Sequence, residues 1–140
     1  MTRICAAIAL TLAVTMAGAP SAMATGTIEC EAMDGGDAYA SILTTRAGSH
    51  MFMPLRGLFG AGDRHFASET LPGAPPAEPI VLAHAYGDAR TIIAEYTTTD
   101  IERPVVSLRL SSAATDEAEA IAGVLLIEGV GVWAVACEAG

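Results

Sequence analysis

Two cysteines, Cys30 and Cys137, constrain this sequence more than any other feature. They lie near the two ends of the chain that remains if an N-terminal export signal is removed, and they do not form the Cys-x-x-Cys spacing of a metal site. In an oxidising compartment, such a pair is expected to form one disulfide. That bond would tie the first and last segments of one domain together. Two buried free thiols, or bridges between molecules, are the alternatives.

The first 24 residues have the three parts of a secretory signal peptide. Met1 to Arg3 is a short basic start, Ile4 to Ala17 is an apolar core, and Ala22-Met23-Ala24 places small residues where signal peptidase reads the chain. The core is shorter than the roughly 20 apolar residues of a membrane-spanning helix, which argues against a retained anchor. We therefore expect cleavage after Ala24, loss of Cys5 with the peptide, and a periplasmic or secreted protein.

The expected mature chain, residues 25–140, has the size of one domain. The full sequence carries seven arginines, no lysine and 16 carboxylates, which gives a formal net charge of -9. An acidic chain is repelled by nucleic acid and by anionic membrane surfaces, and is attracted to basic partners. We expect no nucleic-acid partner and no membrane span. A basic protein partner would fit the charge, although the solubility of a small exported protein also explains it.

Along most of the mature chain, apolar and polar residues alternate at a period of two, which predicts β-strands. In the segment 105–111, for example, Val106, Leu108 and Leu110 share one face. Turn sequences at 34–37, 87–88 and 128–129 each connect the two strands of an expected hairpin, which gives three hairpins. The pattern predicts an all-β fold, a small antiparallel sandwich or barrel of about seven to eight strands.

One short helical turn is expected over residues 112–120. Thr115 has a side chain that can cap a helix, and Asp116 and Glu117 follow in the first turn, where the helix dipole favours negative charge. The segment is too short for more than a turn or two of helix.

Residues 50–78 break the β rhythm and predict one long irregular loop. Its prolines and glycines argue against a long helix or a central strand. A loop this long and this apolar either plugs the core at an open end of the sheet or forms a ligand or partner surface. Aromatic residues and arginine anchor interfaces more often than other residues. The expected partner-binding residues are Phe52, Leu55, Arg56, Leu58 and Phe59.

No catalytic constellation stands out, so we expect neither an enzyme nor a cofactor. The sequence has no Gly-x-Ser-x-Gly elbow and no phosphate-binding glycine loop. A metal site would have to use imidazole and thioether groups, which suit copper(I). Methionines beside phenylalanines are more often packing residues than ligands. The residues that such a site would use are His50, Met51, Met53 and His65.

Three classes of function follow. The leading hypothesis is an exported, non-catalytic β domain that binds a protein partner in the bacterial envelope, as an inhibitor or an accessory subunit. In general plan the chain resembles small periplasmic lysozyme inhibitors, but it lacks their inhibitory-loop residues, so no membership follows. The first alternative is a periplasmic small-ligand or copper-binding protein. The second is a structural or self-associating envelope protein.

Overall fold

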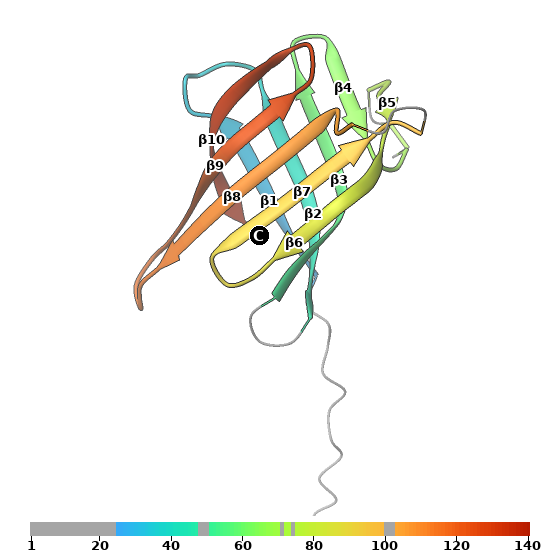
Figure 1. Cartoon of the computed structure of the whole chain (residues 1–140). Coiled ribbons are helices and arrows are strands. Elements are labelled where there is room, and N and C mark those ends of the chain that lie inside the picture. The colour runs from blue at the N-terminus through green and yellow to red at the C-terminus, as the bar shows by residue number, and fades with distance from the viewer. Residues whose placement is uncertain (1–24, 48–50, 71, 74, 100–102) are drawn as a thin grey trace, which may run out of the picture.

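A computed structural model describes residues 25–47, 51–70, 72–73, 75–99 and 103–140 of the chain. The expected signal peptide, residues 1–24, lies outside these residues. The described residues form ten strands and no helix, and all ten strands belong to one sheet (Figure 1). The strands are β1 (Thr25–Ala32), β2 (Tyr39–Ala47), β3 (Met51–Ala61), β4 (Arg64–Ala67), β5 (Glu78–Pro79), β6 (Val81–Gly87), β7 (Thr91–Thr97), β8 (Val106–Ala114), β9 (Glu119–Ile127) and β10 (Gly131–Ala139).

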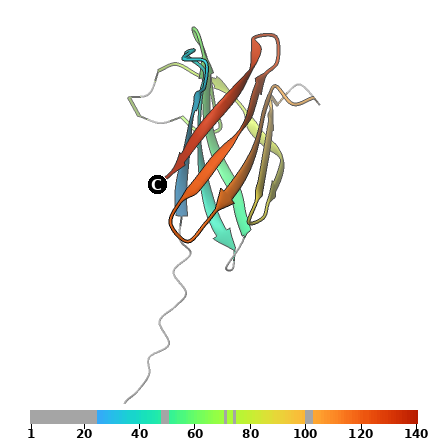
Figure 2. The ribbon, with the colours of Figure 1, turned by 90° about the vertical axis from the view of Figure 1, so that its left-hand side faces the viewer.

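The order of the strands in the sheet is β5-β4-β3-β2-β1-β10-β9-β8-β7-β6. Neighbours are antiparallel, except for the short parallel pair β4 and β5. The sheet curls until β3 and β6 come into contact, which produces a nearly closed barrel whose two halves face each other (Figure 2). The first and last strands of the described fold, β1 and β10, therefore lie side by side at the centre of the strand order. The prediction of an all-β fold is confirmed.

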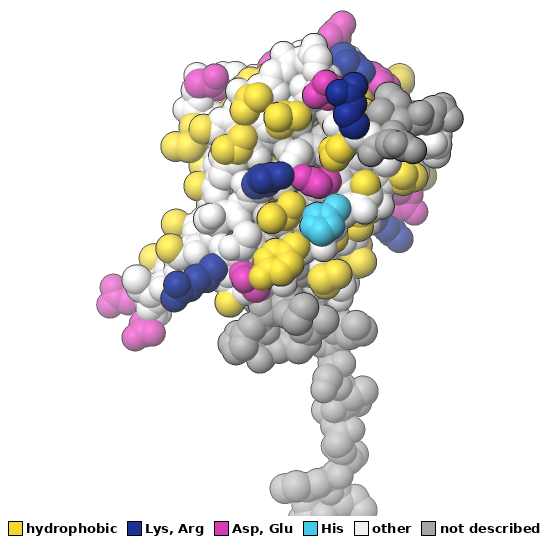
Figure 3. Space-filling view, viewed as in Figure 1, with side chains coloured by type: hydrophobic (Ala, Val, Ile, Leu, Met, Phe, Trp, Pro, Cys, Tyr) yellow, Lys and Arg dark blue, Asp and Glu magenta, His cyan; other side chains and the backbone are white. Residues whose placement is uncertain are grey.

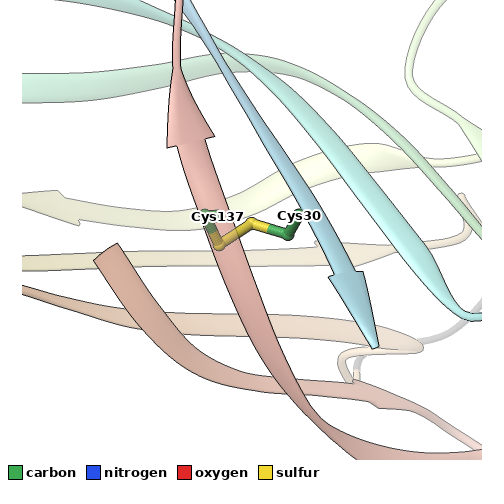
Figure 4. The surroundings of a disulfide bond; sticks show 2 residues. All are labelled: Cys30 and Cys137. Carbon is green, nitrogen blue, oxygen red and sulfur yellow. A yellow bond between two sulfur atoms is a disulfide. The ribbon is translucent and has the colours of Figure 1, made fainter. Parts of the chain in front are cut away.

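The expected disulfide is present between these two strands. Cys30 and Cys137 are directly opposite each other in the register of β1 and β10, and their sulfur atoms are 2.07 Å apart (Figure 4). Cys30 is buried at 2% exposure, so the bond forms part of the core boundary. A disulfide is consistent with an oxidising, extracytoplasmic location.

The core fills the inside of the barrel with the inward side chains of its strands. The predicted alternation in β8 is confirmed, because Val106, Leu108 and Leu110 are buried there. An aromatic contact in the core joins Phe59 of β3 to Tyr96 of β7, with ring centroids 5.0 Å apart. Both rings are fully buried. They pack together where the sheet nearly closes.

The predicted number of strands and the predicted helical turn were wrong. The described residues form ten strands rather than seven or eight, and the segment 112–120 is a hairpin. The amide of Thr115 donates to the carbonyl of Ala118 over 2.8 Å, and the Thr115 hydroxyl accepts from the amides of Glu117 and Ala118. The residue expected to cap a helix therefore closes a tight turn. A helix this short is only marginally stable by itself. The pairing of β8 with β9 over nine positions stabilises the hairpin more than such a helix would be stabilised.

The segment 50–78 is also more regular than the sequence predicted. β3 and β4 form an antiparallel hairpin whose turn contains Gly62 at a φ of 62°. Pro54 is accommodated because the register of β2 and β3 shifts between Leu43 and Thr44, which leaves Leu55 as an extra residue in a bulge. Among the described residues of this segment, the stretch without strand structure lies mainly between β4 and β5.

We predict that the double variant Cys30→Ala/Cys137→Ala loses about 4 to 5 kcal/mol of unfolding free energy, because the bond closes a loop of more than 100 residues. The two cysteines are 107 positions apart. Urea unfolding of the oxidised and reduced wild type measures the effect. The reduced wild type should match the double variant, and an unchanged midpoint in either would contradict the prediction.

We predict that Tyr96→Phe removes a loss of stability at alkaline pH. Burial raises the pKa of Tyr96 to about 12, while the unfolded residue titrates near its usual value of about 10. The folded state therefore keeps Tyr96 protonated up to a higher pH than the unfolded state does. The free energy of unfolding falls as pH rises from about 10 to about 12. From pH 9 to pH 11, wild type should lose about 1 kcal/mol more than Tyr96→Phe in urea unfolding. Equal losses would contradict the assignment.

The same variant should be as stable as wild type or more stable at pH 7. The Tyr96 hydroxyl is buried and has no hydrogen-bond partner among the described groups. Removing a buried, unpartnered hydroxyl takes away a desolvation penalty of about 1 to 3 kcal/mol. A marked loss of stability at pH 7 would mean that the hydroxyl has a partner.

Candidate functional site

A groove of about 480 Å³ lies on the outer face of the sheet, between β1–β3 and the proline-rich segment that precedes β6. Its floor includes the outward side chains of Leu43 on β2 and Leu58 on β3. Its far wall is formed by residues 75–79, here called the strap, which contain three prolines. Figure 2 shows the segment that contains the strap outside the sheet, at the upper left. The groove is therefore a surface feature, separate from the core of the barrel.

The alternation of side chains along each strand determines which residues form the floor of the groove. Ile42 and Phe59 point into the core, so their neighbours Leu43 and Leu58 point outward. Two leucines on an outer face are unusual for an antiparallel sheet, whose wet side is normally polar. Here the strap faces them across the groove, and both side chains are half-buried.

The strap is held at its C-terminal end. The amide of Ile80 donates to the carbonyl of Ala67 over 3.0 Å, and the Ile80 side chain is buried at 2% exposure. Arg64 forms an ion pair with Glu78 at 2.6 Å. Proline fixes the backbone φ angle, so the strap loses little conformational entropy when a ligand binds against it. These features give a preformed wall.

The rim of the groove carries an ion pair and two hydrogen bonds between Gly57 and Ser68. Arg56 and Glu69 lie 2.6 Å apart, with side chains that are about half exposed. The amide of Gly57 donates to the hydroxyl of Ser68, and the amide of Ser68 donates to the carbonyl of Gly57, both over 2.9 Å. An exposed ion pair contributes little to stability. Arg56 and Glu69 are thus available to a bound molecule at little structural cost.

The predicted partner-binding residues separate into different environments. Arg56 and Leu58 line the groove, and Leu55 is 45% exposed at the bulge. Phe59 is fully buried against Tyr96, so its side chain belongs to the core. The side chain of Phe52 lies outside what the structure describes. Leu43 and the strap were not singled out from the sequence, although alternation along β2 could have indicated Leu43.

No metal site was predicted, and of the four weak candidates for metal ligands only His65 and Met53 have side chains that the structure describes. His65 lies on β4, where its Nδ1 atom is 3.1 Å from the Tyr39 hydroxyl, and Met53 is half-buried on β3. His50 and the side chain of Met51 lie outside the described residues. Within the described part of the chain, no three His, Cys, Asp or Glu side chains gather as metal ligands. Burial raises the pKa of Tyr39 above its usual value.

Two other surface features are weaker candidates. A cavity of about 160 Å³ at one end of the barrel is lined by the start of β1, by the last two residues of the chain and by residues such as Thr44 and Ile121. The outer face of β6–β10 exposes several apolar side chains, among them Tyr86, Val124 and Val132. Figure 3 shows hydrophobic side chains on this face interspersed with charged and neutral polar atoms. Scattered exposed apolar residues are normal for a soluble protein and do not by themselves indicate a site.

Comparison with known proteins supplies no relative for this chain. No protein-family model matches it, and neither curated proteins nor solved structures gave a match. Within the described residues, the structure contains no helix of sufficient length and hydrophobicity to cross a membrane.

Proposed function

We propose that the protein is an exported, non-catalytic β domain that binds a protein partner in the bacterial envelope, as an inhibitor or an accessory subunit. The main support is the groove between the outer face of the sheet and the strap. A concave, largely apolar site with a few polar groups at its rim is the usual form of a binding site. Leu43, Leu58 and the strap prolines supply the apolar surface, and Arg56 and Glu69 supply the polar rim.

The shape of the groove favours an extended segment of the partner. The sheet forms one side and the strap the other, so an occupant lies between two preformed walls. The partner would insert a loop or a terminus, and the apolar side chains of that segment would cover Leu43 and Leu58. Such a mode explains two half-buried leucines on an outer face, which a free β domain has no need to expose.

The lining of the groove supports a binding role over a catalytic one. The described lining residues include no histidine and no cysteine. The hydroxyl of Ser68 accepts a hydrogen bond from the Gly57 amide, and no base lies among its recorded partners. A nucleophile needs an adjacent base within hydrogen-bond distance.

A small apolar ligand is the second candidate. The groove volume of about 480 Å³ falls within the range of about 300 to 1,000 Å³ that small-molecule sites occupy. A ligand that binds only the folded state raises the melting temperature. A thermal-shift screen with copper(I) and with small apolar compounds would identify this alternative, and size measured against concentration would identify self-association.

We predict that Leu43→Ser/Leu58→Ser loses capture of the partner, whereas Val124→Ser/Val132→Ser retains it. Both variants exchange two outward aliphatic side chains for serine, and each pair lies on a different face of the barrel. Because both leucines are already half-buried, covering the rest of the two side chains contributes about as much as the full burial of one, about 1.5 to 3 kcal/mol, so the groove variant should weaken binding about tenfold or more. Envelope extract passed over immobilised protein, with mass spectrometry of the bound fraction, supplies the partner for titration.

Circular dichroism and urea unfolding confirm that both variants are folded. Equal capture by the groove variant and wild type would contradict the proposed site. Loss of capture by both variants would show that the partner does not distinguish the two faces of the barrel.

A further inference from the structure

Three carboxylates form an acidic strip beside the groove: Glu29 and Glu31 on β1, and Glu138 on β10. All three are exposed on the outer face of the sheet. Glu29 and Glu138 are directly opposite each other in the register of the two strands. Like charges in this arrangement repel each other and destabilise a strand pair. The free protein therefore holds a charge arrangement that is unfavourable by itself.

The arginines of the described residues do not neutralise this strip. The recorded ion pairs are Arg56 with Glu69, Arg64 with Glu78, and Arg109 with Glu95. None of the three strip carboxylates takes part in an ion pair between described residues. With a formal net charge of -9 and no lysine, the chain offers few cations of its own. Among the described side chains, no cation lies within ion-pair distance of this strip, so a basic partner would meet carboxylates that these side chains leave unpaired.

The strip is continuous with the groove along one row of the sheet. Leu58 on β3 is opposite Ser41 on β2, Ser41 is opposite Glu29 on β1, and Glu29 is opposite Glu138 on β10. Leu58 and Ser41 line the groove, and the two glutamates extend the row beyond its open side. The strap lies at the other end of this row, where Pro79 is paired beside β4. A segment that leaves the groove away from the strap passes over the glutamates.

We infer that the groove binds an extended segment of the partner in which an apolar residue is followed by basic residues. The apolar side chain lies over Leu58 and Leu43, and lysine or arginine side chains pair with Glu29 and Glu138. Adjacent strands are about 4.8 Å apart, so these carboxylates lie about 10 and 14 Å from Leu58 along the row. An extended chain advances about 3.3 Å per residue, which places the basic residues about three and four positions after the apolar one. This inference rests on the proposed binding at the groove and specifies the chemistry of the occupant.

Three labelled peptides test the inference by fluorescence anisotropy. The first has the sequence Ser-Leu-Ser-Ser-Lys-Lys-Ser, the second replaces both lysines by glutamine, and the third replaces both by glutamate. The lysine peptide should bind about tenfold more tightly than the glutamine peptide, since two partly exposed ion pairs each contribute about 0.2 to 1 kcal/mol. The glutamate peptide should bind most weakly. The preference for lysine should shrink as salt is raised, because salt screens exposed charges.

Matched protein variants localise the charge effect. Glu29→Gln/Glu138→Gln should lose the preference for the lysine peptide, bind the glutamine peptide as wild type does, and melt at a higher temperature. Asp116→Asn/Glu117→Gln removes the same number of charges from the turn between β8 and β9 and should keep the preference. Equal binding of the lysine and glutamine peptides by wild type would overturn the inference. So would a preference that survives in Glu29→Gln/Glu138→Gln, or the absence of any binding of the lysine peptide.

The two proposals fail in different ways. If Leu43→Ser/Leu58→Ser abolishes the binding of all peptides while wild type binds the lysine and glutamine peptides equally, the groove is a binding site and the basic occupant is excluded. If the lysine peptide binds this variant as tightly as wild type, the contact is electrostatic only, and both the groove and this inference fail.

Discussion

The pairing of β1 with β10, crossed by the Cys30–Cys137 disulfide, is the constraint on which the barrel depends. In the strand order of the described residues, every other neighbouring pair of strands is also consecutive in the chain. The fold is thus two meanders, β1–β5 and β6–β10, joined by one ladder between strands that are distant in sequence. On the opposite side, β3 and β6 touch without forming a ladder. Because long-range pairing carries the largest loop-closure cost, a covalent bond at this ladder acts where the fold is entropically weakest.

The candidate site lies beside this seam, the ladder between β1 and β10. The groove floor belongs to the first meander, on the outer faces of β2 and β3, whereas the acidic strip crosses the seam from β1 to β10. The like-charged pair Glu29 and Glu138 therefore faces solvent on the ladder that the disulfide holds. A covalent link at this ladder offsets the repulsion between the two carboxylates. In this account, the bond lets the protein keep a charge arrangement that serves binding at the expense of stability.

The sequence predicted the features that depend on local period and on cysteine chemistry: strands throughout, the alternating face of β8, and the bond between the chain ends. It failed where tertiary contacts override local rules. Gly57 and Gly60 look like strand breakers, yet in β3 they leave room for rings, since a Cβ at Gly57 would collide with Phe59 and Tyr96. The groove could not be predicted, because it exists only where the strap returns over the outer face of the sheet. Alternation along β3 could have separated the outward Leu58 from the inward Phe59.

We propose that the groove is the surface at which this protein meets its partner. Site-specific photo-crosslinking in intact bacteria tests it most directly, with a benzophenone amino acid in place of Leu58 in the groove or of Val132 on the outer face of β10. The account predicts that one defined protein cross-links through position 58 and does not cross-link through position 132. A cross-link of equal yield at both positions, or cross-linking through position 132 alone, would contradict it.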